Sequence, residues 1–227
     1  MNNKLISFHE VSKTFKVGEE NFTALRDINL EIKTGSFMSF VGPSGSGKTT
    51  LLNLIVGLDV PTSGDIFFKD IKLSSFSRNK MAKYRRENIG FIFQTYNLLP
   101  VYSVYENILL PLLLNGLKEN TVRERVIDIV SKVGLLDQIK KKPSQLSGGQ
   151  CQRVAIARAL VKDPLLILAD EPTANLDSKN SLQILELMQK LNQQYKAAVV
   201  FSTHDEKVTR YIDREIGLED GKIIFDK

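Results

Sequence analysis

The chain has 227 residues, of which 42% are hydrophobic and 25% charged, the balance of an ordinary globular protein with one large or two small domains. The net charge of +5 permits contact with phosphates or an anionic surface, but it does not by itself indicate a nucleic-acid-binding protein. The single cysteine excludes an intramolecular disulfide, and the first residues lack the apolar run of a secretory signal. We therefore expect a cytoplasmic protein.

The first ninety residues predict mainly β-strands. Apolar residues alternate or run together in four segments bounded by turn-like residues: 5–11, 24–32, 37–41 and 65–70. A glycine-rich loop follows the third segment, and residues 48–58 then show the apolar positions of a buried helix that ends at Gly57. Residues 89–93 predict another buried strand, which ends just before Gln94.

From residue 95 to about residue 163 the pattern becomes helical. The window 95–117 carries a single charged residue, Glu106, but prolines and asparagines interrupt it, and a membrane-spanning helix needs about 20 mainly apolar residues. We expect short buried helices there, with an apolar patch available to a partner. Residues 121–135 show a helical apolar stripe that stops at Gly134.

Strands and helices alternate in the last third of the chain. Residues 165–170 and 197–203 are apolar, strand-like runs, and residues 181–195 between them predict a helix. Residues 216–225 predict a hairpin that turns at Asp220-Gly221. This alternation predicts an α/β fold with a mostly parallel sheet covered by helices.

Ligands of such sheets collect beyond the carboxyl ends of the strands. Four of the expected strands are followed at once by chemically suggestive residues: Gly42, Gln94, Asp170-Glu171 and His204. We therefore expect the functional site at this edge.

The segment GPSGSGKT, residues 42–49, matches the P-loop pattern completely. Its glycines let consecutive backbone amides turn toward an anion, Lys48 would reach the β- and γ-phosphates, and the Thr49 hydroxyl would bind Mg²⁺. The residues expected to bind the nucleotide here are Gly42, Pro43, Ser44, Gly45, Ser46, Gly47, Lys48, Thr49 and Thr50.

Four further residues complete the expected site. Asp170 would hold Mg²⁺ directly or through water, and the adjacent Glu171 would orient or deprotonate a water molecule. Gln94 is expected as a further metal ligand, and His204 as a donor to the γ-phosphate, although a glutamine at a strand end is often only a loop residue and a lone histidine is usually a packing or surface residue. The chain has no base-reading motif of the GTPase kind, so the base is expected to stack on an aromatic ring. Phe15 is the candidate, although an ordinary strand-end aromatic explains it equally well.

The stretch LSGGQ, residues 146–150, precedes an obvious helix and has the composition of an anion site, yet no lysine or threonine completes a nucleotide site there. Because one triphosphate has one γ-phosphate, the most economical interpretation is that this stretch caps the γ-phosphate held by a second copy in a two-fold dimer. An ordinary helix N-cap followed by glycines explains the pattern equally well.

Six elements, namely GPSGSGKTT, Gln94, LSGGQ, LLILADE, ANLD (174–177) and His204, stand in the order typical of ABC transporter ATP-binding subunits, and the chain resembles that family over essentially its whole length. The resemblance implies a RecA-like P-loop fold with an N-terminal antiparallel β subdomain. It places this subdomain and the core in residues 1–94, an inserted helical subdomain that docks on a membrane permease at about 95–163, and the rest of the core at 164–227.

The resemblance also implies ATP and Mg²⁺ as cofactors and a homodimer around two ATP molecules. It implies catalytic roles for Lys48, Gln94, Glu171 and His204, and contact of Ser147, Gly148, Gly149 and Gln150 with the partner's ATP. Asp177 would lie at the dimer interface and link the two sites. No nucleic acid is expected.

Residues 85–112 and the short chain are similar to the MacB/LolD type, which implies export or release of a peptide, drug or lipoprotein at the inner face of the cell membrane. Two positions depart from the family pattern: Phe15 stands where tyrosine is usual, and Cys151 where glutamine is common. Cys151 is interpreted either as a packing residue or as a thiol that makes hydrolysis redox-sensitive.

Two other classes stay open. One is a regulatory, division-type ABC ATPase that acts on a membrane partner without transport. The other is a soluble ABC ATPase acting on nucleic acid or ribosomes, which usually carries two cassettes or long insertions that this chain lacks. A P-loop kinase outside the ABC family would leave LSGGQ, ANLD and His204 unexplained.

Overall fold

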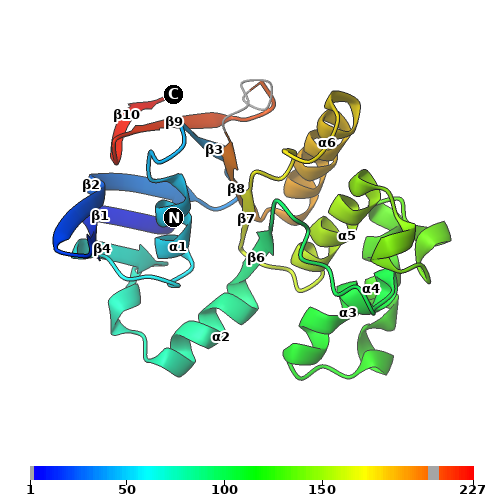
Figure 1. Ribbon diagram of the computed structural model, residues 1–227. Coiled ribbons are helices and arrows are strands. Elements are labelled where there is room, and N and C mark those ends of the chain that lie inside the picture. Colours follow the sequence, from blue (N-terminus) through cyan, green and yellow to red (C-terminus); the bar gives the residue numbers. More distant parts are fainter. Residues whose placement is uncertain (1–2, 204–209) are drawn as a thin grey trace. The chain divides into compact units, whose positions relative to one another are not determined.

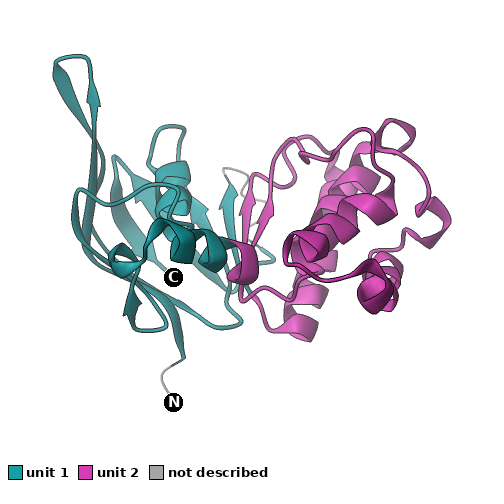
Figure 2. Ribbon diagram, turned by 90° about the horizontal axis from the view of Figure 1, so that it is seen from below, with its two compact units in different colours: residues 1–85, 198–227 teal, residues 86–197 magenta. Residues whose placement is uncertain are grey.

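The computed structural model describes residues 3–203 and 210–227, which fall into two compact units (Figures 1 and 2). Unit 1 comprises residues 1–85 and 198–227, and unit 2 comprises residues 86–197.

The N-terminal part of unit 1 is an antiparallel sheet in the order β2-β1-β4-β5, with β1, β2 and β4 visible side by side in Figure 1. Its strands are β1 (Lys4–Val17), β2 (Glu20–Lys33), β4 (Ser63–Phe68) and β5 (Ile71–Lys72). The expected antiparallel β subdomain is therefore confirmed. Both N-terminal strands extend beyond their apolar cores, because backbone pairing continues into the polar hairpin end as far as Val17 and Glu20.

The part of the six-stranded second sheet that belongs to unit 1 has the order β10-β9-β3-β8. Its strands are β3 (Phe37–Val41), β8 (Ala198–Thr203), β9 (Arg214–Glu219) and β10 (Lys222–Asp226). β3 is parallel to both β8 and β9, whereas β9 and β10 form the predicted hairpin. All of β8 and nearly all of β3 are buried, as their continuous apolar sequences predict for central strands.

Helix α1 (Lys48–Ile55) follows β3 and ends as predicted, with Gly57 at a positive φ of 62°. Helix α2 (Arg78–Asn88) was not predicted, because its sequence has almost no apolar stripe. Its buried residue, Tyr84, packs edge-on against Phe68 and donates from its hydroxyl to the Ile55 carbonyl at 3.0 Å.

Unit 2 contains the parallel pair β6 (Ile89–Ile92) and β7 (Leu166–Asp170). Its helices are α3 (Val104–Leu114), α4 (Glu119–Lys132), α5 (Gly148–Leu160) and α6 (Ser178–Tyr195) (Figure 1). The residues that the structure describes also form three short 3₁₀ helices: Leu73–Ser75, Leu136–Gln138 and Pro143–Gln145.

Residues 95–163 contain the helices α3, α4 and α5, as their sequence predicts. The apolar window 95–117 contains α3, which spans Val104–Leu114 and has Pro111 inside it. In the part of the chain that the structure describes, no helix is both long and apolar enough to cross a bilayer. The proposed subdomain boundaries near residues 94 and 163 stay predictions.

Candidate nucleotide site

The P-loop connects β3 to α1 in unit 1, as predicted. Gly42 has a φ of 150°, and a Cβ there would lie 2.0 Å from the Leu218 carbonyl oxygen, so only glycine fits the start of the loop. Gly45 has a φ of 81° and is exposed, with nothing within 4 Å of where its Cβ would stand. The loop is thus closed against β9 at one end and open to a ligand at its tip.

Lys48, the first residue of α1, is buried although it is a cation. Its ammonium donates to the carbonyl oxygens of Gly42 at 2.7 Å and Pro43 at 2.8 Å. The loop therefore holds the lysine in an ordered position beside its own backbone. A positive charge and the N-terminus of α1 together favour an anion such as a triphosphate.

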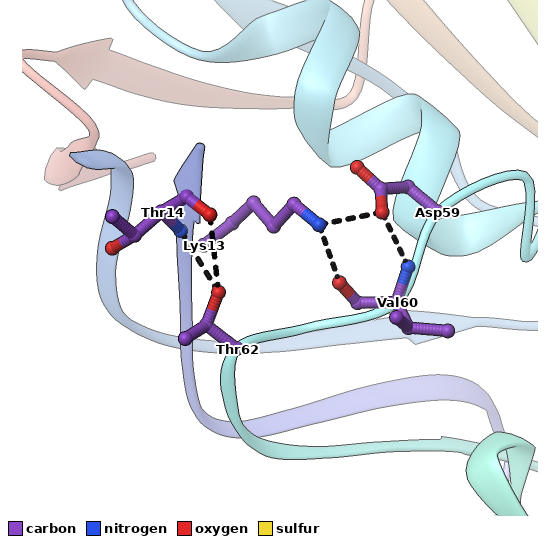
Figure 3. A network of polar contacts seen from close by, with 5 residues as sticks. All are labelled: Lys13, Thr14, Asp59, Val60 and Thr62. Carbon is purple, nitrogen blue, oxygen red and sulfur yellow. Dashed lines mark hydrogen bonds and ion pairs between the residues drawn. The ribbon is translucent and has the colours of Figure 1, made fainter. Parts of the chain in front are cut away.

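Phe15 lies on β1 with 37% of its surface exposed, and the Lys13 ammonium is 4.7 Å from its ring centroid. Lys13 is buried and also contacts the Asp59 carboxylate at 2.5 Å and the Val60 carbonyl at 2.8 Å (Figure 3). Beside it, Thr14 and Thr62 share two hydrogen bonds. These contacts fix the Phe15 strand to the segment that follows α1, and the Phe15 ring stays partly exposed.

The two predicted acids stand at the end of β7 in unit 2. Asp170 is the last strand residue, and both Asp170 and Glu171 are half-buried. Glu171 has a φ of 44°, a left-handed conformation that costs a non-glycine residue about 1–3 kcal/mol and is typical of functional sites. Strand β7 thus ends in a strained turn that carries a carboxylate.

Gln94 follows β6, the parallel neighbour of β7, so the two strand ends reach the same edge of this pair. The Asn175 amide donates to the Gln94 carbonyl at 2.9 Å and connects the two loops. Arg158 of α5 donates to the carbonyls of Tyr96, at 2.7 Å, and Asn97. The loop after Gln94 is therefore held by groups from both the 171–177 segment and α5.

LSGGQ forms the start of α5. Ser147 is the N-cap and makes a capping box with Gln150, in which the Gln150 N–H donates to the Ser147 hydroxyl at 3.3 Å and the Ser147 N–H to the Gln150 side chain at 2.9 Å. Ser147 and Gly148 are exposed, whereas Gly149 is buried. The N-cap interpretation is thus confirmed as local structure, and the exposed Ser147-Gly148 end stays available to a ligand.

Cys151 is 7% exposed, and its thiol lies 3.7 Å from the Pro143 carbonyl. Burial raises the pKa of this thiol, so the reactive thiolate is disfavoured. These observations favour the packing interpretation of Cys151 over a redox role.

Asp177 is the N-cap of α6 and accepts hydrogen bonds from the Asn180 N–H at 2.9 Å and from the Asn180 side-chain amide at 2.7 Å. These bonds hold the pKa of Asp177 below its usual value, so the residue is anionic at neutral pH. Its carboxylate is exposed beside the N-terminal turn of α6.

Unit 2 therefore brings together Gln94, the two acids, the signature stretch and Asp177, whereas Phe15 and the P-loop belong to unit 1. His204 lies outside the described residues. Sequence reasoning missed Lys13, Arg158 and Gln152. Their side chains contact residues that are distant in the chain, at separations of 46, 62 and 20 positions respectively. No local pattern carries such a signal.

The donor chemistry fits ATP with magnesium. Within residues 3–203 and 210–227, no three His, Cys, Asp or Glu side chains gather into a metal site. Mg²⁺ needs no such cluster, because it keeps several waters and usually takes one or two protein ligands together with substrate phosphates. A P-loop with an ordered lysine, and carboxylates at the end of another parallel strand, define a P-loop nucleoside triphosphatase.

The comparisons with known proteins narrow this class. Residues 25–174 match the family model described as ABC transporter. The chain is 44% identical over 223 residues to the ABC transporter ATP-binding protein YvrO of Bacillus subtilis (strain 168), covering 98% of this chain and 97% of that protein. It is 41% identical over 223 residues to the lipoprotein-releasing system ATP-binding protein LolD of Buchnera aphidicola, covering 98% of both chains.

The structure resembles a dimeric post-hydrolysis state of the ATP-binding cassette MJ0796 of Methanocaldococcus jannaschii bound to ADP and Pi. The TM-score is 0.88 at 43% sequence identity, and the match covers 98% of both chains. The chain belongs to the ABC transporter family, has the P-loop ATPase fold of its cassettes, and is an ATP-binding, ATP-hydrolysing subunit of that family.

Proposed function

We propose that the chain is the ATPase of a MacB/LolD-type transporter, in which two copies close around two ATP molecules and drive a permease at the inner face of the cell membrane. The observation that carries this proposal is the exposed Ser147-Gly148 end of α5. It is a helix N-terminus suited to phosphate, but its own sequence supplies no lysine to complete a site. A γ-phosphate presented by a second copy would fit this need.

Within one copy, the P-loop residues 42–50 would bind the phosphates, with Lys48 pairing with the β- and γ-phosphate oxygens. Phe15 would stack on adenine. The Thr49 hydroxyl would be one ligand of Mg²⁺, with Asp170 and Gln94 as the others. The ion would neutralise charge on the phosphates when bound.

Glu171 would orient or deprotonate the attacking water, as general bases do by accepting a proton in the transition state. His204 would donate to the γ-phosphate. Ser147, Gly148, Gly149 and Gln150 would bind the partner's ATP, and Asp177 would connect the two sites across the dimer interface.

The relatives indicate a class of cargo. Those named LolD are described as lipoprotein-releasing system proteins, and they match this chain at 39–41% identity over nearly its whole length. We propose a lipoprotein, peptide or drug as the cargo of the partner permease. The comparisons give no support to a regulatory or nucleic-acid-linked alternative.

The test is the Glu171→Gln variant, which keeps the shape of the side chain but cannot take a proton. We expect ATP binding to persist, hydrolysis to fall by about 10²–10⁴-fold, and an ATP-stabilised dimer to accumulate. Steady-state ATPase assays and analytical ultracentrifugation with and without MgATP measure these effects.

The matched control is Glu186→Gln. Glu186 is an exposed glutamate on α6 of the same unit, and the variant protein should hydrolyse ATP normally. Normal hydrolysis by the Glu171→Gln variant would remove Glu171 from its role. A variant that is inactive but stays monomeric with MgATP would contradict the dimer.

A further inference from the structure

Gln152 lies in α5, five residues after the Ser147 N-cap, and its side chain points into the core of unit 2 with an exposure of 0%. Its amide nitrogen donates to the Pro172 carbonyl at 2.6 Å. Its amide oxygen is buried and has no hydrogen-bond partner among the residues that the structure describes. Burying a half-satisfied amide costs free energy that an aliphatic side chain would avoid, so packing alone does not explain this glutamine.

The acceptor of this bond lies in the turn that carries Glu171. Pro172 follows Glu171 directly, and its ring fixes its own φ, so holding its carbonyl restrains the Pro172–Thr173 peptide, which is separated from the glutamate by one residue of fixed φ. The turn is also closed by a bond from the Ala174 N–H to the Glu171 carbonyl at 3.2 Å. The Gln152 bond reaches the same turn from a separate helix, and its acceptor residue directly follows Glu171, which is held at a φ of 44°.

The N-terminus of α5 packs on the same segment further along. A Cβ at Gly148 would lie 3.5 Å from the Leu176 side chain, and a Cβ at Gly149 would lie 3.1 Å from the Asn180 side-chain oxygen. The first two turns of α5 therefore contact residues 172–180 at several points. A shift of this helix end would be passed directly to the Glu171 turn.

We propose that Gln152 is a positioning residue for ATP hydrolysis. By holding the Pro172 carbonyl it keeps the strained Glu171 turn in the conformation that presents the carboxylate to water, and it couples the signature end of α5 to the glutamate of the same chain. This inference rests on the proposed role of Glu171. It predicts an effect on the catalytic step rather than on nucleotide binding.

The Gln152→Met variant tests it, because methionine has a similar length and no strong hydrogen-bonding group. We expect kcat for ATP to fall about tenfold or more, since small misplacements of catalytic groups have effects of this size. KM for ATP should stay within about twofold, because Gln152 is not expected to touch the nucleotide and its loss should not change uniform binding of the substrate. In the Glu171→Gln background, the same change should leave ATP-dependent dimerisation intact.

The matched control is Asn192→Leu. Asn192 is a second buried amide of unit 2, 7% exposed, and it donates to the Ala197 carbonyl at 2.7 Å near the C-terminal end of α6. This variant also loses a buried amide-to-carbonyl bond, so its melting temperature should fall at least as much, but kcat per folded molecule should be unchanged. Gln152→Asn, whose amide is one methylene too short to keep the bond, is used if the methionine variant does not fold.

An unchanged kcat in Gln152→Met, an equal fall in kcat in Asn192→Leu, or a rise in KM alone would overturn the inference. If Glu171→Gln itself hydrolyses ATP normally, the proposed function of Glu171 fails and this inference fails with it. If Glu171→Gln is inactive while Gln152→Met is fully active, only the positioning role of Gln152 is wrong.

Discussion

Lys48 is ordered by its own loop. Two backbone carbonyls, of Gly42 and Pro43, accept hydrogen bonds from its ammonium, and the side chain is 8% exposed. A cation buried in this way loses hydration and is compensated by these bonds. A phosphate is a stronger hydrogen-bond acceptor than a neutral carbonyl. The Lys48 ammonium would therefore leave the two loop carbonyls for the oxygens of a bound triphosphate, and little reorganisation of the side chain would be needed.

The proposed stacking of Phe15 on adenine can be tested with a single substitution. Base–aromatic stacking is worth about 1–3 kcal/mol by alanine substitution. We therefore expect Phe15→Ala to raise KM for ATP by about tenfold, since 1.4 kcal/mol is a factor of ten, with a smaller effect on kcat. Fluorescence titration with a labelled ATP analogue should give about the same tenfold ratio between the dissociation constants of the variant and the unchanged protein.

The control for Phe15 is its cross-strand neighbour. Phe22 on β2 is paired in register with Phe15 and is 54% exposed, so Phe22→Ala removes a similar ring from the same hairpin. It should leave KM for ATP nearly unchanged. Equal effects of the two substitutions would show that the hairpin, and not the Phe15 ring, is what the nucleotide site requires.

Among the elements, α3 has the most complete N-terminal cap. The Ser103 N–H and hydroxyl both donate to the Glu106 carboxylate at 2.7 Å, and the Glu106 N–H donates to the Ser103 hydroxyl at 3.3 Å. The hydrogen bond from the Ser103 backbone is the main reason that the pKa of Glu106 lies below its usual value of 4.5. The capping box therefore favours the ionised carboxylate.

This cap predicts a pH-dependent contribution to stability. A carboxyl whose pKa is lowered by folding stabilises the folded state above its unfolded pKa, here 4.5, and the contribution is lost as the pH falls through the folded value. We expect Ser103→Ala to lower the free energy of unfolding by about 1 kcal/mol at pH 7. The difference should shrink below pH 4.5, as measured by urea denaturation at both pH values.

Ser131→Ala on α4 is the comparison, because Ser131 is exposed within a helix rather than at its N-cap. It should change stability by a few tenths of a kcal/mol at most, and equally at both pH values. Because alanine keeps the backbone N–H that donates to Glu106, a Ser103→Ala deficit that is the same at pH 7 and below pH 4.5 would mean that the Ser103 hydroxyl does not stabilise the Glu106 charge.

The elements that the sequence predicted are those whose pattern is local. Sequence patterns predict such elements because burial repeats at a strand or helix period. Examples are the apolar runs of β3, β7 and β8, the stripe of α4 and the Asp220-Gly221 hairpin. Helix α2 has no such stripe and was missed. In the candidate site, the motif residues could be predicted from their order in the sequence. The contacts of Gln152 and Lys13 could not, because their partners are backbone or loop atoms distant in the chain.

At the scale of the whole molecule, the proposed function requires a surface that meets a permease. The resemblance assigns this contact to the helical segment of unit 2. Its loop before α3 exposes Val101, which is 68% accessible. A single exposed apolar residue is ordinary on a protein surface, so Val101 serves as a probe of the permease contact and is not itself evidence for it.

The last prediction uses a matched pair of exposed valines. Tagged Glu171→Gln protein is recovered from membranes solubilised with ATP present, and its partners are identified by mass spectrometry. We expect a stoichiometric polytopic membrane protein, whose recovery falls about tenfold with Val101→Asp because burying an unpaired charge in an apolar contact is costly. Val17→Asp, at a residue 65% exposed on the β1–β2 hairpin, should not change recovery.

Both valine variants should still form the ATP-dependent dimer, because neither residue belongs to the proposed nucleotide site, and this separates loss of partner binding from loss of nucleotide chemistry. If Val101→Asp and Val17→Asp recover the membrane protein equally, the loop before α3 is not part of the contact. If only soluble proteins or nucleic acid are recovered with ATP, the permease-coupling proposal is wrong, while ATP binding and hydrolysis by the cassette are unaffected.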